Sequence, residues 1–308
     1  MIFTIPQPTA KITWMIFNNF GPVLVDIGAS VRPPKIWDSL AKSSTYVGFD
    51  PDRREIQTSA SGNFKKSIII NKAVVENERL KKVKFFFTKF PFCSSILKPD
   101  HASLANYIFF HYFQVIKTGI VPVTTLARVA KTLGLKSFDW IKIDTQGTDL
   151  RIIKSLPPNL RNQVLAIDIE PGLIDAYEQE DLFTASHEWM TKNGFWLSNL
   201  EVKGAARINS DGLKLASQLK IPFKKLWQRK SPGWCEARYF RTPQWLKDHD
   251  LPTEKYLLLW LFAMTDNQLG FTLDVISAYE KEFGKDTYSH HMRSLSKNKS
   301  RFSLFGLT

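Results

Sequence analysis

Val23-Leu24-Val25-Asp26-Ile27-Gly28 is an apolar run of strand length that ends on an acid and a glycine. A run without polar alternation predicts a buried parallel strand, which here leads into a tight turn. A short helix is expected over residues 34–41, because Pro34 suits a first helical turn. The next apolar run, 45–49, stops at Asp50-Pro51, where the proline cannot continue a strand ladder. This strand, helix and strand predict the start of a doubly wound α/β sheet, whose ligands bind beyond the carboxyl ends of the strands.

Apolar runs and helical spacing continue to alternate along the chain. Residues 67–70 and 73–75 together predict a third strand, and 83–88 predict an edge partner guarded by lysines. Further strands are expected at 140–144, 164–170, 195–202 and 235–240, and helices at 126–135 and 182–192. We therefore expect a mostly parallel sheet with helices on its faces.

A change of character at Pro243 divides the chain. Residues 1–20 are expected to form a lead segment, 21–242 the main domain and 243–308 a helical extension, because apolar residues recur at helical spacing after Pro243. We expect two or three helices there, packed on the core. The last fifteen or so residues are rich in Ser, Lys and Asn, which predicts a flexible basic tail.

The charge of the chain is strongly positive but uneven. The 308 residues include 42 Lys and Arg against 29 Asp and Glu, and 44% are hydrophobic, which excludes general disorder. Three segments, 65–84, 214–241 and 281–308, hold more than the whole excess of +13, so the remainder is slightly acidic. Such clusters suit phosphate groups in nucleic acid, an anionic head group or a nucleotide sugar, and they are equally explained as solvated faces.

Cysteine use and hydropathy limit the class of protein. Cys93 and Cys235, the two cysteines, give neither a disulfide framework nor a metal-binding CxxC pair. The longest apolar run, 256–264, is nine residues, about half of the roughly 20 needed to cross a bilayer. No signal peptide is expected, because prolines and a lysine interrupt the first residues. These features predict a cytoplasmic protein without a transmembrane segment, and they leave peripheral membrane association open.

Two acids lie where strands end. A carboxylate at Asp50, after the second strand, lies where the ribose of a bound nucleotide presents its hydroxyls. Gly28 and Ala29 are small enough for a ligand to approach the backbone of the first turn. The chain lacks the G-x-G-x-x-G and G-x-x-x-x-G-K-[ST] motifs, which argues against NAD and ATP. An ordinary tight turn is the competing explanation.

Three motifs fall in the predicted order of the sheet: VLVDIGA at 23–29, YVGFDP at 46–51 and IKIDTQGTDL at 141–150, the last followed by Ile153-Lys154. Together they resemble the FkbM family of class I S-adenosylmethionine-dependent methyltransferases, which shows a VDVGA-type first motif, an acid-Pro pair and a KID-[VT]-[EQ]-G-x-[ED] motif. The resemblance runs from about Val23 to Phe240. It implies a doubly wound, Rossmann-like and mostly parallel seven-stranded sheet, with S-adenosyl-L-methionine as the cofactor.

Residue by residue, the resemblance implies a cofactor pocket. Asp26, Gly28 and Ala29 would shape its methionine and ribose side, with Ser30 next in the same turn, and Asp50 would hold the ribose hydroxyls. After Ala29 the chain has Ser-Val-Arg-Pro-Pro, where the family usually has an Asn and a further glycine.

The third motif implies the catalytic end of the site. Asp144 and Gln146 would lie beside the sulfonium methyl, although the family more often has Glu at the position of Gln146. For a hydroxyl acceptor the protein must align the nucleophile and remove its proton. We expect Asp144 to do this, with Glu170 as a substitute or a second polar contact, and the alternative for Asp144 is a helix cap. No structural metal is expected, but Mg²⁺ bridging Asp144 and Asp168 or Glu170 stays open.

Three functions follow from these motifs. The first is O-methylation of a hydroxyl on a sugar, a glycan or a natural-product-like acceptor. An anionic or lipid-linked acceptor is included in this function. The second is an RNA or DNA methyltransferase, although the chain has IDTQG where base-directed enzymes usually have an Asp/Asn-Pro-Pro-aromatic loop. The third is a non-catalytic adaptor that binds a phosphorylated glycan. The aromatic insert 94–120 is expected at the substrate mouth or as a packing element over the sheet.

Overall fold

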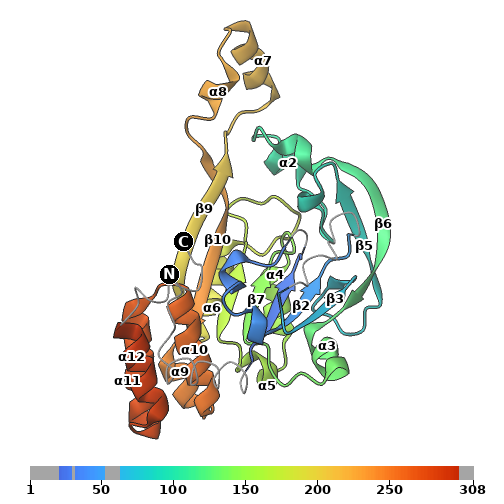
Figure 1. Cartoon of the computed structure of the whole chain (residues 1–308). Coiled ribbons are helices and arrows are strands. Elements are labelled where there is room, and N and C mark those ends of the chain that lie inside the picture. Colours follow the sequence, from blue (N-terminus) through green and yellow to red (C-terminus); the bar gives the residue numbers. More distant parts are fainter. Residues whose placement is uncertain (1–20, 30–31, 53–62, 298–308) are drawn as a thin grey trace.

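A seven-stranded sheet forms the centre of the molecule (Figure 1). The computed structural model describes residues 21–29, 32–52 and 63–297. The strand order is β3-β2-β1-β7-β8-β10-β9, and β10 runs antiparallel to both of its neighbours. The bounds are β1 (Val23–Ile27), β2 (Thr45–Phe49), β3 (Lys66–Ile70), β7 (Trp140–Ile143), β8 (Ala166–Ile169), β9 (Phe195–Ala205) and β10 (Ser231–Arg241). The predicted α/β fold with a mostly parallel seven-stranded sheet is confirmed.

Helices cover one face of this sheet in the expected way. They are α3 (Leu126–Leu133), α4 (Asp149–Ser155), α5 (Pro158–Arg161) and α6 (Phe183–Lys192). Their apolar side chains pack with those of β1, β2, β7 and β8 in one buried cluster. Gly134 ends α3 in the left-handed conformation, with φ +65°, as a glycine at that position allows.

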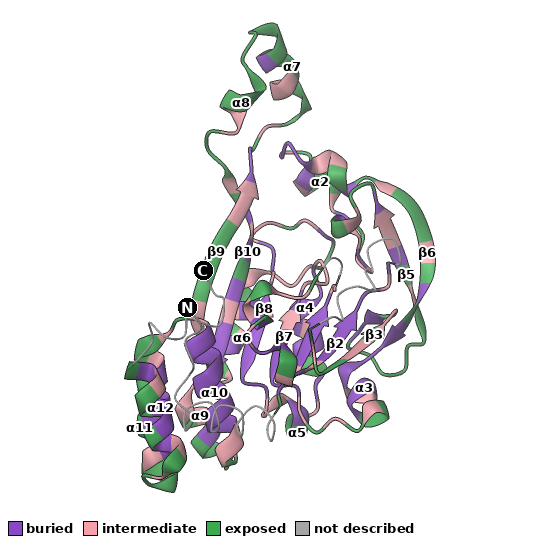
Figure 2. Cartoon of the chain, viewed as in Figure 1, coloured by how far each residue is buried: buried purple, intermediate pink, exposed green. Residues whose placement is uncertain are grey.

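The opposite face is covered by the C-terminal part of the chain. Here α10 (Thr253–Thr265) packs on Trp37, Tyr46, Trp140 and Phe240, and nearly all of its side chains are buried (Figure 2). The helix is apolar on all sides, which is typical of a helix inside a core. Around it lie the short helices η1 (Lys35–Trp37) and η2 (Ala41–Ser43) and the helices α9 (Pro243–Asp248), α11 (Leu269–Phe283) and α12 (Thr287–Lys297). The C-terminal helices therefore complete the core.

A buried ion pair fixes α10 to the amino end of the sheet. The Nζ of Lys255 lies 2.5 Å from Oδ1 of Asp139, and the other carboxylate oxygen of Asp139 accepts a hydrogen bond from the N–H of Val23 at 2.8 Å. Removal of one partner would leave a buried charge alone, which is costly. The contact therefore sets the position of α10 against β1 and β7.

A second, three-stranded sheet has the order β4-β6-β5. It consists of β4 (Ala73–Val74), β5 (Lys82–Thr88) and β6 (Val115–Thr124). Residues 73–75 therefore do not continue the third strand, and 83–88 pair antiparallel with β6 instead of with the edge of the central sheet. The sequence did not reveal β6, because Ile116 and Ile120 are exposed and Gly119 and Pro122 interrupt the run.

The β9–β10 hairpin extends beyond the rest of the molecule as an arm (Figure 1). Its end carries α7 (Ser210–Gln218) and α8 (Phe223–Leu226). Three short helices face the base of the arm. They are α2 (His101–Leu104) and η5 (Phe110–Phe113), which belong to the aromatic insert 94–120, and η4 (Pro91–Cys93), which directly precedes it. Within the described ranges, no helix is both long enough and apolar enough to span a bilayer.

Candidate functional site

The carboxyl ends of four parallel strands meet at one edge of the sheet. Ile27 of β1 pairs with Phe49 of β2 and with Ile143 of β7, and Ile143 pairs with Ile169 of β8. The residue after each of these positions is Gly28, Asp50, Asp144 or Glu170. The register of the sheet therefore brings four of the sequence-predicted site residues to one place.

The turn after β1 requires a glycine. Gly28 has φ +84°, and a Cβ built on it would lie 2.2 Å from the carbonyl oxygen of Asp144. The N–H groups of Gly28 and Ala29 both donate to the carbonyl oxygen of Phe49 at 2.9 Å. These contacts hold the ends of β1, β2 and β7 together. Ser30 and Val31, which follow, lie outside the described residues.

Beneath this turn lies a charged cluster around Lys142. Its Nζ is 3.4 Å from Oδ1 of Asp26 and 3.7 Å from Oδ2 of Asp144, and it donates to the carbonyl oxygen of Gly28 at 3.3 Å. Asp26 is buried and accepts a hydrogen bond from the hydroxyl of Tyr46 at 3.0 Å. Burial raises the pKa of Asp26, and the charge of Lys142 opposes that rise. Asp26 thus contributes to the site through Lys142.

Lys142 is a site residue that sequence reasoning did not assign. Burial acts to lower its pKa, but the negative charges of Asp26 and then Asp144 outweigh burial and raise it, so the ammonium group stays charged. A usable signal was present, because Lys142 and Asp144 are two residues apart and side chains at that spacing share one face of a strand.

Asp50 lies in a small cavity at the ends of β1 and β2, which we call the strand-end cavity. Its lining includes Gly28, Asp52, Val74 and Phe85, and the chain continues from Asp52 into residues outside the described ranges. The Oδ1 of Asp50 accepts a hydrogen bond from the N–H of Asp52 at 2.7 Å. Burial raises the pKa of Asp50 to about 7. A carboxylate here is largely ionised above neutral pH and can accept hydrogen bonds from a vicinal diol.

The loop after β7 presents Asp144 and Gln146 as a hydrogen-bonded pair. The amide Nε2 of Gln146 donates to Oδ1 of Asp144 at 2.6 Å, and the hydroxyl of Tyr177 lies 2.8 Å from Oε1 of Gln146. Gln146 has φ +58°, a conformation that few residues other than glycine adopt. A glutamate carboxylate in this place could not donate to Asp144, whereas the amide of Gln146 can.

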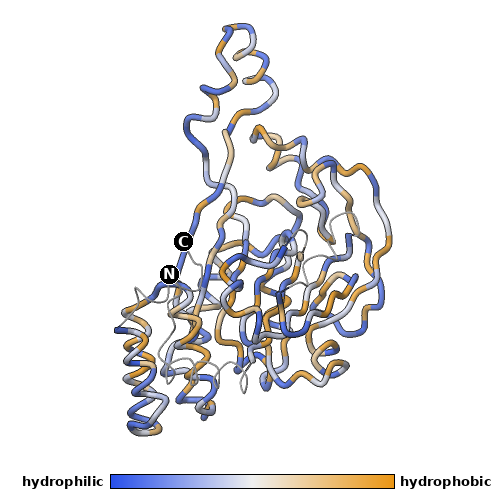
Figure 3. Tube along the Cα trace, in the orientation of Figure 1, coloured by the Kyte–Doolittle hydropathy of each residue, from blue (hydrophilic) through white to orange (hydrophobic). Residues whose placement is uncertain are grey.

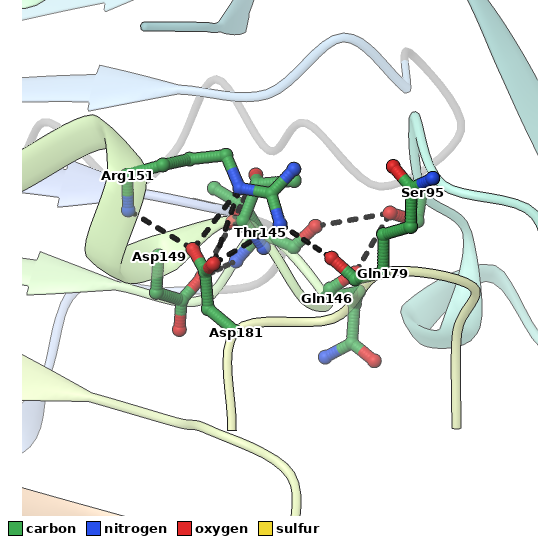
Figure 4. Close-up of polar contacts among 8 residues, drawn as sticks. Ser95, Thr145, Gln146, Asp149, Arg151, Gln179 and Asp181 are labelled. Atoms are coloured by element: carbon green, nitrogen blue, oxygen red, sulfur yellow. Dashed lines mark hydrogen bonds and ion pairs between the residues drawn. The ribbon is translucent and has the colours of Figure 1, made fainter. Parts of the chain in front are cut away.

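Neighbouring segments hold this loop from two sides (Figure 4). The hydroxyl of Ser95 donates to the carbonyl oxygen of Gln146 at 2.7 Å, and the N–H of Asp181, whose side chain pairs with Arg151 at 3.0 Å, donates to the carbonyl oxygen of Gly147 at 2.8 Å. The strained φ of Gln146 is therefore supported by contacts from the insert and from the loop after β8.

The buried Asp149 joins the ends of β7 and β8. Its Oδ1 accepts a hydrogen bond from the N–H of Thr145 at 2.8 Å, and its Oδ2 accepts one from the N–H of Glu170 at 3.2 Å. Helix α4 begins after Thr148 without a side-chain cap. The last acid of the third motif thus anchors the loop, and Asp144 does not cap this helix.

Glu170 is the most perturbed carboxyl of the edge. Burial and then the negative charge of Asp144 raise its pKa to about 9. Glu170 is therefore protonated at neutral pH, so its carboxyl group can donate a hydrogen bond. With Asp144 and Gln146, it lines a cavity of about 430 Å³, which we call the aromatic cavity.

The aromatic cavity is built mostly from segments outside the central sheet. Its aromatic lining comprises Phe90, Phe92, Phe109, Tyr112, Phe113, Tyr177, Trp227 and Trp234. Residues of the insert and of the arm base thus face one another across it. Asp144, Gln146 and Phe92 line both this cavity and the strand-end cavity, so the two meet at the end of β7.

A third cavity of about 300 Å³, the charged cavity, lies beside Lys142. Its lining includes Asp26, Arg32, Asp168 and Arg238. The guanidinium group of Arg238 binds both carboxylate oxygens of Asp168, at 2.7 and 3.0 Å. Across the described ranges, no group of three or more His, Cys, Asp or Glu is arranged to hold a metal ion.

Comparison with known proteins agrees with the geometry of this edge. The family described as the methyltransferase FkbM domain matches residues 26–197, more than half of the chain, and the match contains the ends of β1, β2, β7 and β8. No curated protein matches the chain significantly. With its strand order, its three motifs at the strand ends and this match, the chain belongs to the FkbM family of methyltransferases.

Proposed function

We propose that the protein is an S-adenosylmethionine-dependent O-methyltransferase that acts on a hydroxyl group bound in the aromatic cavity. The observation that carries this proposal is the position of Asp144 and Gln146 on the wall common to the strand-end and aromatic cavities. A methyl donor on one side and an acceptor on the other would meet at these two side chains.

The residues of the edge fit S-adenosylmethionine, which supplies a methyl group on a positively charged sulfur. Asp50 would accept hydrogen bonds from the ribose hydroxyls, and Gly28 lines the same cavity. The strand-end cavity, about 70 Å³, is too small for the whole cofactor, so its amino-acid end would extend into the charged cavity. In the charged cavity, the guanidinium group of Arg32 could bind the carboxylate of the cofactor, and the acidic side chains of the lining could bind its amino group. Ser30, which also belongs to this set, stays a prediction.

Asp144 is the proposed base. Its Oδ1 is held by the amide of Gln146, and its Oδ2 lies 3.7 Å from Nζ of Lys142. From this position the carboxylate of Asp144 would orient the acceptor hydroxyl and take up its proton as the oxygen is methylated. Glu170, protonated at neutral pH, would donate a hydrogen bond to a second oxygen of the acceptor.

The aromatic cavity supports an acceptor with a ring face and several hydroxyls, such as a sugar, a glycan or a natural-product-like molecule. Aromatic side chains pack against the apolar faces of rings, while the carboxyl groups of Glu170 and Glu180 are hydrogen-bonding groups on the same wall. The proposal includes acceptors that are lipid-linked or anionic. It also places this protein in the cytoplasm, in peripheral association with a membrane. The loop Asp144-Thr145-Gln146-Gly147 gives little support to a base-directed nucleic-acid methyltransferase.

Calorimetry with S-adenosylmethionine tests the proposal. We expect binding by the unaltered chain and at least tenfold weaker binding by Asp50→Ala, because the ribose hydroxyls lose an ionised acceptor, a contact worth about 1.5–3 kcal/mol. Asp38→Asn is the control, because Asp38 is an exposed acid between β1 and β2, and this variant should bind the cofactor normally. Absence of binding at high micromolar cofactor would favour the adaptor over the enzyme.

A further inference from the structure

We infer that the end of the arm, residues 207–230, is a docking surface for an anionic lipid bilayer. We call this segment the arm tip. It contains α7 and α8 and projects away from the rest of the molecule (Figure 1). Apart from Trp227, which lines the aromatic cavity, the segment contributes to none of the three cavities, so the proposed catalytic function does not explain its exposed basic and apolar side chains.

The arm tip exposes large apolar side chains to solvent. The exposed fractions are 54% for Leu215, 62% for Leu219, 39% for Ile221 and 59% for Phe223. Leu215 and Leu219 are four residues apart at the end of α7 and therefore share one face of the helix. Figure 3 shows hydrophobic and hydrophilic residues closely interleaved along this projection, and Figure 2 shows that most of it is exposed. Four such side chains gathered at a projecting end predict an interaction surface.

The charges of the same segment are almost all positive. Asp211 is its one acid, and it pairs with Lys214 at 3.1 Å. Within the described part of the chain, no ion pair engages the exposed basic side chains of Lys220, Lys224, Lys225, Arg229 and Lys230. The +7 charge of the basic segment 214–241 is thus concentrated largely here, next to the exposed apolar side chains.

An anionic bilayer is the partner that satisfies both features at once. Basic side chains bind the anionic head groups, while Leu219 and Phe223 enter the boundary between head groups and acyl chains. A nucleic acid would neutralise the lysines but would leave the leucines and Phe223 in water. An acidic protein would also match the charge, but basic side chains beside exposed leucine and phenylalanine side chains are typical of a segment that binds at a membrane interface.

Docking in this way has a geometric consequence for the aromatic cavity. Trp227, at the end of the arm tip, and Trp234, in the arm base, both belong to the lining of that cavity. The cavity would then open close to the lipid surface, where a lipid-linked acceptor could enter it. This consequence, unlike the docking itself, rests on the proposed function.

Vesicle flotation with the full chain tests the docking. We expect the protein to float with vesicles of phosphatidylcholine and phosphatidylglycerol in equal parts but not with phosphatidylcholine alone, and to be released by salt. Leu219→Asp with Phe223→Asp should weaken binding to the mixed vesicles at least tenfold, and Lys224→Glu with Lys225→Glu should do the same. Leu273→Asp, at a 53% exposed leucine of α11, and Lys131→Glu with Lys136→Glu, at exposed lysines, are matched controls and should bind normally.

Three results would overturn the inference. The first is equal vesicle binding by the unaltered chain and both arm-tip variants. The second is the absence of vesicle binding together with RNA binding that only the lysine variant loses. The third is a dimer of the unaltered chain that the apolar variant abolishes. Calorimetry with S-adenosylmethionine on each variant separates this inference from the proposed function, because the arm-tip variants should bind the cofactor as the unaltered chain does.

Discussion

The strand-end cavity and the aromatic cavity meet at Asp144, yet they are built in different ways. One wall of the strand-end cavity is made by the turns directly after β1, β2 and β7, whose relative positions the sheet register fixes, and the rest is made by Val74 and Phe85 of the second sheet and by the segment 91–96. The aromatic cavity is made by side chains from the insert, the loop after β8 and the arm, which lie far apart in the sequence. The acidic wall of the strand-end cavity thus depends on the central sheet, whereas most of the aromatic cavity depends on additions to that sheet. Substitutions should therefore affect the two sides separately, except at the residues that they share.

The largest expected effect is at the shared wall. Asp144→Asn should lower kcat by about 10²–10⁴, because the acceptor proton loses its base, while the affinity for S-adenosylmethionine changes little. Single-turnover methyl transfer and calorimetry measure the two quantities. A near-normal rate with cofactor bound would show that Asp144 is not the base.

Gly28→Ala should damage the strand-end cavity through the backbone. Its φ of +84° and the close approach to Asp144 predict a loss of about 3 kcal/mol or more in the free energy of unfolding, with cofactor binding lost. Gly134→Ala is the control, because Gly134 also has a positive φ but has nothing within 4 Å of an added Cβ, so its loss should be about 1 kcal/mol. Chemical denaturation measures both, and equal losses would mean that the close approach is unimportant.

The affinity for S-adenosylmethionine should depend on pH through Asp50. Its pKa of about 7 means that lowering the pH from 8 to 6 protonates the group and removes an acceptor for the ribose hydroxyls. We expect about tenfold weaker binding at pH 6 than at pH 8, measured by calorimetry. Asp50→Asn should bind weakly at both values with a flatter profile, and a variant that kept the full pH dependence would assign it to another group.

The smallest expected effect is on stability, at the aromatic cavity. The folded protein raises the pKa of Glu170 to about 9, so its stabilising contribution is complete below the ordinary value and is lost as the pH rises toward 9. Glu170→Gln should therefore raise Tm at pH 9 by several degrees and change it much less at pH 5. A thermal unfolding series measures this, and equal shifts at both pH values would point to a cause other than titration.

The difference between the cavities also explains what the sequence could predict. Asp26, Asp50 and Asp144 could be placed because each one lies in or directly after an apolar run, and parallel strands end at one edge. Lys142 could have been found from its spacing to Asp144. That Trp227 and Phe92 line one cavity could not be predicted, because no local pattern relates residues that far apart in the chain. The strand β6 was missed for a physical reason, since Ile116 and Ile120 are exposed and so break the expected alternation of apolar buried and polar exposed residues.

The burial of α10 has a consequence for how the chain is made. Trp37, Tyr46, Trp140 and Phe240 are all present before residue 253 emerges from the ribosome, but their common cover is not. During synthesis this face of the sheet stays exposed to solvent and prone to aggregation until α10 is made. A chain that ends at a premature stop after β10 never acquires this helix. Quality-control proteases and chaperones would recognise the exposed aromatic surface of such a truncated chain, although the chain would contain every residue of the matched family domain.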